Sequence, residues 1–196
     1  MFLKLVCMPT KENKKPREFV HTLYTGVSQS GKTTLARSIS RGLCLAKEKV
    51  VIFDPLGSPT AGGGWGNGAI IFDDKEAFLD LVYSEDFINA HLFIDEAHNI
   101  FAHDDKSHLW LLTEGRHFYL TLHLMTQRPK KVHPDARTNC GRCFMFRLAQ
   151  DDAREIGADY GHSGINRISL DKGDFLLLNS GSAEYSRGNV FNLLEN

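Results

Sequence analysis

Residues 26–34 read GVSQSGKTT, and this segment has the residue types and spacing of a phosphate-binding loop. The pattern G-x-x-x-x-G-K-[ST] is met by Gly26, Gly31, Lys32 and Thr33. In such a loop the backbone N–H groups hold phosphate oxygens, the lysine reaches the β- and γ-phosphates, and the threonine hydroxyl ligates Mg²⁺. We therefore predict a nucleoside triphosphate site formed by Gly26, Val27, Ser28, Gln29, Ser30, Gly31, Lys32, Thr33 and Thr34.

A second segment, HLFIDEAH at 91–98, is an apolar strand that ends in two adjacent acids. Asp95 is placed to hold Mg²⁺, directly or through water. Glu96 is placed to orient or deprotonate an attacking water molecule. The pair predicts hydrolysis of the triphosphate rather than transfer of its phosphoryl group to a small acceptor.

The elements that position these residues follow from the apolar patterning. We predict one domain over 1–196, with a strand and charged turn in 1–18, a core in 19–170 and a closing β-hairpin in 171–196. Because strands alternate with helices, the fold class is α/β, a three-layer domain with a parallel sheet. Strands are predicted at 2–6, 19–25, 49–54, 69–72, 90–94, 118–126, 143–148, 174–179 and 189–194, and helices at 35–47, 75–84, 107–114 and 151–156.

The composition limits the function classes. The net charge is −1, so any contact with nucleic acid must be local rather than global. No apolar run is long enough to span a membrane, the N-terminus is not expected to be a signal peptide, and four cysteines predict no disulfide framework. Cys140 and Cys143 form one CxxC, for which a metal or redox role and a plain place at a strand edge both stay open.

The strand at 49–54 separates the phosphate loop from the Asp95 strand. This arrangement, together with Glu96, resembles the RecA-like branch of P-loop NTPases, which implies a core strand order of 5-1-4-3-2. No N-K-x-D segment that reads guanine is present, so ATP is the expected nucleotide. The letters DEAH at 95–98 spell a helicase box, but such helicases need a much longer chain with two domains.

Five further segments resemble the FtsK–HerA superfamily of DNA-pumping ATPases. They are EGRH (114–117), TQRP (126–129), VVIFDPLG (50–57), FMFRLAQDDAREIG (144–157) and DFLLLNSG (174–181). The resemblance covers roughly residues 19–194. Because the chain is short, it is most similar to the single-domain genome-packaging ATPases of tailless icosahedral viruses that contain a membrane.

The resemblance implies roles for several residues. Lys32, Thr33 and Asp95 would bind Mg²⁺ and ATP, Glu96 would activate water, and Gln127 would sense the γ-phosphate. Arg116 would act in trans as an arginine finger, with Arg128 as the alternative finger. The implied partners are further copies of the chain in a hexameric or pentameric ring, double-stranded DNA, and a capsid vertex or viral membrane protein, in the host cytoplasm or the virion.

A basic stretch is the candidate DNA-binding surface. Residues 116–147 contain seven Lys or Arg residues against one acid, Asp135. Clustered basic residues fit phosphate contacts. The alternative, that these residues are divided between an arginine finger, solvated surface and subunit contacts, stays open. The candidates are Lys130, Lys131, Arg137 and Arg142, together with Trp65 in the glycine-rich segment 57–68, which could stack on DNA.

Three other functions are compatible with the sequence. One is an ATPase for phage assembly or export of the zonula-occludens-toxin type. Another is a nucleotide-controlled, nucleic-acid-binding scaffold, and the third is a small-molecule kinase, which Glu96 argues against.

Overall fold

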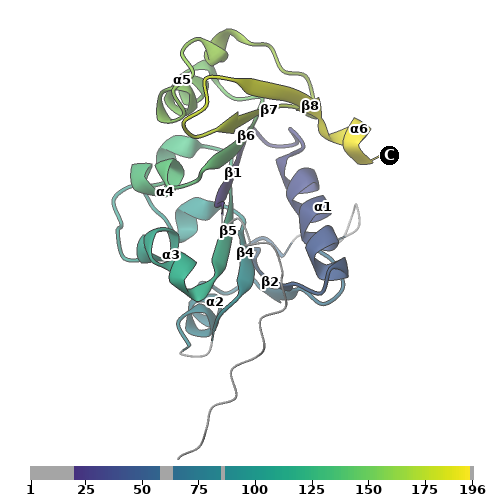
Figure 1. The fold of residues 1–196 in the computed structure, drawn as a ribbon, viewed down its shortest axis with the longest axis vertical. Helices are drawn as coiled ribbons and strands as arrows, with labels where there is room; N and C mark the ends of the chain where they lie inside the picture. The colour runs from purple at the N-terminus through teal and green to yellow at the C-terminus, as the bar shows by residue number, and fades with distance from the viewer. Residues whose placement is uncertain (1–19, 58–63, 85–86, 195–196) are drawn as a thin grey trace, which may run out of the picture.

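The computed structural model describes residues 20–57, 64–84 and 87–194, so the predicted strand at 2–6 and the charged turn at 11–18 lie outside the described residues. The fold is a single twisted sheet with helices on both faces (Figure 1). The strands are β1 (Thr22–Thr25), β2 (Lys49–Phe53), β3 (Ile70–Phe72), β4 (Ala90–Ile94), β5 (Leu120–Thr126), β6 (Arg142–Phe146), β7 (Asp174–Asn179) and β8 (Tyr185–Asn189). The α-helices are α1 (Lys32–Leu45), α2 (Lys75–Val82), α3 (Trp110–Thr113), α4 (Pro134–Thr138), α5 (Gln150–Asp159) and α6 (Val190–Leu194). The 3₁₀ turns are η1 (Ala97–Asn99), η2 (Gly115–Phe118), η3 (Pro129–Lys131) and η4 (Ile165–Arg167).

The strand order confirms the predicted architecture. The sheet runs β3-β2-β4-β5-β1-β6-β7-β8, and the strands from β2 to β6 are parallel to one another. Numbered along the chain without the short edge strand β3, its core reads 5-1-4-3-2 from β6 to β2. In such a sheet the carboxyl ends of all core strands meet at one edge.

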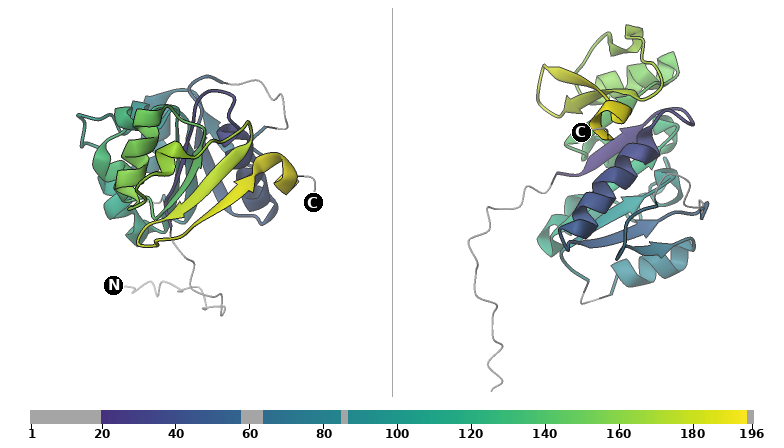
Figure 2. Two further views of the ribbon diagram at one scale, coloured as in Figure 1. Left: turned by 90° about the horizontal axis from the view of Figure 1, so that it is seen from above. Right: turned by 90° about the vertical axis from the view of Figure 1, so that its right-hand side faces the viewer.

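Two apolar layers cover the two faces of this sheet. On one face α1 packs against the strands with Leu35 and Ala36, and α6 adds Val190 (Figure 2, right). On the other face the helices from α2 to α5 bury a larger cluster. Every residue of β4 and β5 is buried. The continuous apolar run of β4 has the pattern of a strand that is covered on both sides.

Two predicted elements differ in the structure. The hairpin is present, but its second strand is β8 at 185–189, and residues 190–194 form α6 instead of a strand. Val190 leaves the sheet and packs against the face that α1 covers, which the apolar run alone did not reveal. The predicted helix at 107–114 is shorter, because α3 begins only at Trp110 and ends at Thr113, where the 3₁₀ turn η2 takes the chain to β5.

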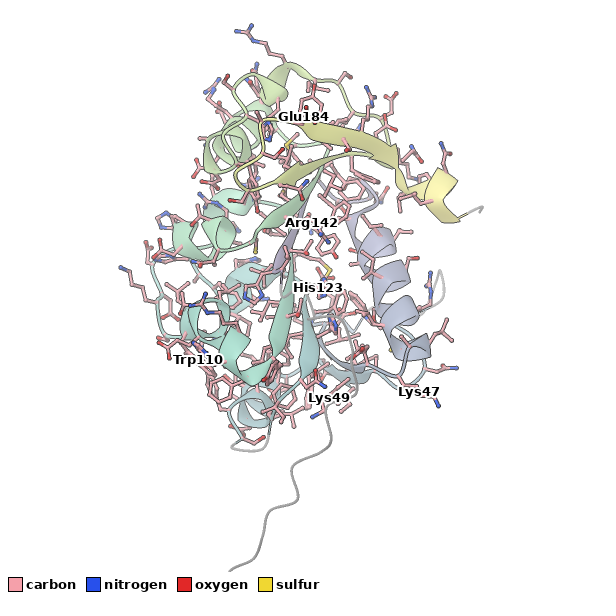
Figure 3. All side chains as sticks on the ribbon, in the orientation of Figure 1. Lys47, Lys49, Trp110, His123, Arg142 and Glu184 are labelled. Atoms are coloured by element: carbon pink, nitrogen blue, oxygen red, sulfur yellow. The ribbon has the colours of Figure 1, made fainter. Side chains whose placement is uncertain are left out.

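Buried histidines lie inside the sheet (Figure 3 labels His123). One ring nitrogen of His123 is 3.0 Å from the Tyr24 hydroxyl and the other is 3.1 Å from His91. The backbone N–H of Leu122 donates to Nδ1 of His21, so Nε2 of that ring carries the hydrogen and donates to a backbone carbonyl. Burial lowers the pKa of His21, and burial together with the neighbouring His91 and His21 holds the pKa of His123 well below its usual range.

These depressed pKa values predict that acid destabilises the fold. The unfolded chain binds protons at these rings near the ordinary pKa of 6.5, whereas the folded chain does so only at lower pH. The stabilisation that comes from keeping these rings neutral is therefore fully present above that pH. As the pH is lowered further, the free energy of unfolding decreases by up to about 1.4 kcal/mol per pH unit for each ring. Urea unfolding at about pH 7.5 and about pH 5.5 measures the difference.

A matched pair of variants checks the assignment. His123→Gln should make the stability less dependent on pH, and His103→Gln, at an exposed ring, should leave the dependence as in the wild type. An unchanged pH dependence in His123→Gln would contradict the role given to this ring.

Candidate nucleotide-binding site

The phosphate loop connects β1 to α1 and is anchored by backbone hydrogen bonds to two neighbouring strands. The N–H of Gly26 donates to the carbonyl of Thr126 (3.3 Å), and the N–H of Val27 donates to that of Arg147 (2.9 Å). A side chain at position 26 would collide with Phe146, because a Cβ there would lie 2.6 Å from its Cβ. The first glycine of the motif is therefore required by close packing at the base of the loop.

A cavity of about 300 Å³ opens at the start of α1. It is lined by the loop residues from Gln29 to Thr34, whereas Gly26 and Val27 lie at the base of the loop. The first N–H groups of a helix have no intrahelical acceptor, and the helix dipole makes this end positive. The cavity is therefore built for an anion such as a phosphate chain.

Two cavity residues come from the opposite end of the chain. Lys172 and Phe191 complete the wall, and the N–H of Gly173 donates to the carbonyl of Ser30 (3.0 Å). Sequence reasoning missed both wall residues, since no motif links a segment near the C-terminus to a loop more than a hundred residues earlier. The one signal in the sequence that could have indicated a role for Lys172 is its position, as a basic residue, just before β7.

Lys32 is buried with its ammonium group close to the acids of the site. Burial lowers the pKa of Lys32, and the nearby charges of Asp95 and Glu96 act in the opposite direction. A buried cation is tolerated only with anionic partners. The lysine is thus held between two carboxylates and the cavity where phosphates would lie.

Asp95 follows β4 and lies beside a second acid, which the motifs in the sequence did not assign to the site. Asp54 follows β2, and the parallel register of Phe53 with Ile94 places the two carboxylates side by side. Burial raises the pKa of Asp95 to about 6, and the charges of Asp54 and Glu96 add to this rise. The available signal was the acid at the end of the strand 49–54.

The donor set fits Mg²⁺. Hard cations prefer carboxylate and hydroxyl oxygens, and Thr33 and Asp95 supply one of each beside the loop. The concentration of buried carboxylates that raises the pKa of Asp95 is also the environment that a divalent cation would neutralise.

Glu96 is fixed by its neighbours in an unusual backbone conformation. The amide Nε2 of Gln127 donates to one carboxylate oxygen of Glu96 at 2.6 Å, and Nδ1 of His98 lies 3.5 Å from the other. Glu96 has φ 48°, which is rare for a residue other than glycine. Such strain persists where surrounding contacts impose it, as at functional sites.

A second cavity of about 280 Å³ lies over this carboxylate. Its lining joins Glu96, His98 and Gln127 with Arg128 and Lys131 of the following turn. The structure thus brings the predicted water-activating acid, the predicted sensor and the alternative finger together in one subunit. His98 and Lys131 were not expected in this role.

Arg116 lies elsewhere. It is exposed in η2, before the start of β5, whereas Gln127 follows the end of the same strand. The strand has seven residues. At about 3.3 Å per residue, the two ends are separated by roughly 20 Å. Arg116 is therefore at the sheet edge opposite to its own nucleotide cavity.

The structure corrects the interpretation of Trp65. The ring is 4% exposed and packs against Phe93, and its indole N–H donates to Asp54 at 2.9 Å. The guanidinium of Arg37 lies over the ring, 5.1 Å from its centroid. A DNA base cannot stack on a ring in this position, so Trp65 is a core residue beside the site.

The basic stretch does not form one surface. Arg137 is 1% exposed and bonds to Asp159 (2.7 Å), Glu155 (2.6 Å) and two backbone carbonyls, so it has no group free for DNA. Lys130 and Lys131 are exposed in η3, after the end of β5. Half-buried Arg142 begins β6 (labelled in Figure 3) and lies at the opposite edge of the sheet.

Arg137 is therefore predicted to support stability. Arg137→Gln leaves Asp159 and Glu155 without their cation, and breaking a buried ion pair costs about 3 kcal/mol or more. Urea unfolding measures this loss. Arg128→Gln, at an exposed position, is the control and should change the free energy of unfolding by less than about 0.5 kcal/mol. Wild-type stability in Arg137→Gln would contradict this role.

The cysteines of the CxxC lie in the core. Cys140 and Cys143 are buried free thiols, and burial raises the pKa of both. Within the described residues, no three His, Cys, Asp or Glu side chains gather in a way that could hold a metal ion. The same part of the chain contains no helix that is both long and apolar enough to cross a membrane.

Strand order and phosphate loop together define the RecA-like P-loop NTPase fold. The structure is similar to that of the genome-packaging NTPase B204 of Sulfolobus turreted icosahedral virus 2 in complex with ATP-γ-S. The TM-score is 0.72 at 20% identity, over 87% of this chain and 97% of that chain. B204 of Sulfolobus turreted icosahedral virus, a DNA-packaging ATPase, gives a TM-score of 0.71 at 19% identity over the same shares.

A third similar structure is the pCW3 conjugation coupling protein TcpA, in a monomer form with ATP-γ-S. It has a TM-score of 0.67 at 16% identity, over 87% of this chain and 60% of that chain. The Zonular occludens toxin (Zot) family model matches residues 71–149, less than half of the chain. No curated protein sequence matches. These likenesses confirm the predicted fold and the resemblance to P-loop ATPases of the FtsK–HerA type.

Proposed function

We propose that this chain is a Mg²⁺-dependent ATPase that drives DNA into a viral capsid. The observation that carries the proposal is the Glu96 carboxylate, which Gln127 holds at 2.6 Å at the sheet edge where the phosphate loop opens. The fold shared with B204, whose structures are of a packaging NTPase, supports packaging as the purpose of the hydrolysis.

The site residues divide the work of hydrolysis. The loop N–H groups and Lys32 bind the phosphates of ATP, and Glu96 accepts a proton from the attacking water. Gln127 orients that carboxylate and reports the state of the γ-phosphate to β5. Thr33 and Asp95 would hold Mg²⁺, which supplies charge neutralisation at the phosphates.

The position of Arg116 supports a site shared between subunits. Because Arg116 lies at the opposite sheet edge, roughly 20 Å of strand away, it would serve the ATP of a neighbouring copy. Arg128 lines the cavity of its own Glu96 and is the alternative finger. We propose a hexameric or pentameric ring around double-stranded DNA, attached to a capsid vertex or viral membrane protein, in the host cytoplasm or the virion.

Hydrolysis should depend on Glu96. Glu96→Gln removes the proton acceptor and should lower kcat by about 10²–10⁴-fold while ATP still binds. The rate is measured by phosphate release with and without duplex DNA, and ATP-γ-S binding by fluorescence. Equal rates in wild type and variant would remove Glu96 from the mechanism.

Mixed subunits test the finger. Arg116→Ala should be nearly inactive because an arginine finger contributes a factor of about 10³–10⁵ to the rate. Glu96→Gln should be nearly inactive because it lacks the proton acceptor. Mixing the two variants should restore part of the activity, because an intact site then meets an intact finger. Arg128→Ala mixed with Glu96→Gln is the comparison, and restoration only in that mixture would assign the finger to Arg128.

One specific observation favours a second candidate. The Zot family model spans the segment that contains Glu96, Arg116 and Gln127, which fits an ATPase for phage assembly or export. Such an ATPase would hydrolyse ATP without stimulation by duplex DNA. A nucleotide-controlled scaffold would turn ATP over slowly and regardless of DNA.

A further inference from the structure

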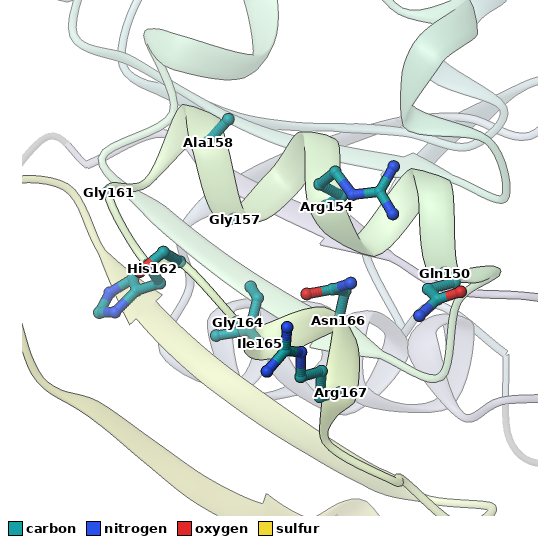
Figure 4. A pocket seen from close by; sticks show the side chains of 11 residues that line it. Gln150, Arg154, Gly157, Ala158, Gly161, His162, Gly164, Ile165, Asn166 and Arg167 are labelled. Carbon is teal, nitrogen blue, oxygen red and sulfur yellow. The ribbon is translucent and has the colours of Figure 1, made fainter.

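A hollow lies away from the nucleotide site, between α5 and the turn that follows it. It has a volume of about 580 Å³ and is hereafter the α5 groove. In Figure 4 α5 forms one wall and the segment 161–167 the other, with Asn166 and Arg167 reaching from the turn toward the helix. The hairpin β7–β8 runs behind this turn.

The lining of the α5 groove is cationic and rich in hydrogen-bond donors. It contains Arg154 and Arg167, the amides of Gln150 and Asn166, and no acidic side chain. Among the described residues the guanidinium of Arg167 makes no ion pair or hydrogen bond. Arg154 has one partner, Asp151, but both side chains are largely exposed, so this pair is weak and exchangeable.

The groove is preformed. The N–H of His162 donates to the carbonyl of Gly157 at 2.7 Å, which draws the turn onto the helix. A Cβ at position 157 would lie 2.7 Å from that turn, so the close approach needs glycine. The His162 ring is 6% exposed, packs edge-on against Tyr185, and has no partner for Nε2 among the described residues.

The chain that forms the outer wall of the groove leads on to the nucleotide cavity. Five residues after Arg167 comes Lys172, which lines that cavity, and Gly173 bonds to Ser30 of the phosphate loop. At its other end the groove begins at Gln150, shortly after Arg147, whose carbonyl anchors the base of the same loop.

We propose that the α5 groove binds the phosphodiester backbone of duplex DNA through Arg154 and Arg167. This inference rests on the proposed function, which makes DNA the polyanion at hand. Guanidinium groups pair with phosphate oxygens in a planar, two-point geometry, and amides complete such contacts. The groove supplies the open cationic surface that buried Arg137 and buried Trp65 do not.

The test measures DNA binding without nucleotide, by anisotropy of a fluorescein-labelled duplex over a range of salt concentrations. Arg154→Gln with Arg167→Gln should weaken binding severalfold and reduce the slope of log K against log salt by about 1 for each arginine. Lys47→Gln, which removes a charge at the far end of α1 (Figure 3), should leave the slope unchanged. An unchanged slope in the double variant overturns the proposal.

A second pair of variants does not depend on the arginines. Ser163→Glu places an anion in the groove and should weaken DNA binding. Ser163→Gln introduces a neutral side chain of the same size as glutamate and should bind DNA as the wild type does. Equal binding by the two variants contradicts the proposal.

Competition separates the sources of the anion. Unlabelled duplex should displace the probe, and inorganic phosphate or polyglutamate at matched ionic strength should not. Displacement by phosphate indicates a small-anion site, and displacement by polyglutamate an acidic protein partner; either result overturns the proposal. ATP hydrolysis by the wild type, measured in parallel, reports the proposed function separately: its absence would leave the DNA result standing.

Discussion

The shared direction of the core strands is the constraint on which the site depends. Parallel strands end at one edge, so the residues that follow them meet without being close in sequence. Asp54, Asp95 and Gln127 each follow a different strand, and Lys32 begins the helix after a fourth. The same constraint explains the electrostatics, since burying these carboxylates together raises the pKa of Asp95 to about 6 beside a lysine whose pKa burial lowers. The site is thus a concentration of charge that the sheet imposes and that ligands would balance.

Much of the fold was predictable because its signals are local. The apolar run of β4 ends at Asp95, and the phosphate loop fixes both the end of β1 and the start of α1. The strand order came from resemblance and was confirmed. Local signals failed where a tertiary contact decides the structure. Val190 continues an apolar run that suits a strand, yet it leaves the sheet and packs against the face that α1 covers.

The site was predictable in its motifs and less so in its surroundings. Asp95 and Glu96 follow β4, and Gln127 at the end of β5 bonds to Glu96. Lys172 and Phe191 reach the nucleotide cavity from the C-terminal part of the chain, for which no sequence motif was available. Charge counting also included a basic residue that the structure shows to be buried. A count along the chain cannot distinguish Arg137, which two acids from α5 neutralise, from Arg167, which faces an open groove.

Strand β5 has a further consequence for a ring. The 3₁₀ turn η2 just before this strand carries Arg116, and the last residue of the strand adjoins Gln127. In the proposed assembly, one fully buried strand would therefore connect two different active sites. Any sliding of β5 that follows loss of a γ-phosphate at one end would displace the finger at the other. Successive sites would then hydrolyse ATP in a fixed direction around the ring. The order of hydrolysis would come from the stiffness of a single strand rather than from contacts relayed through many residues.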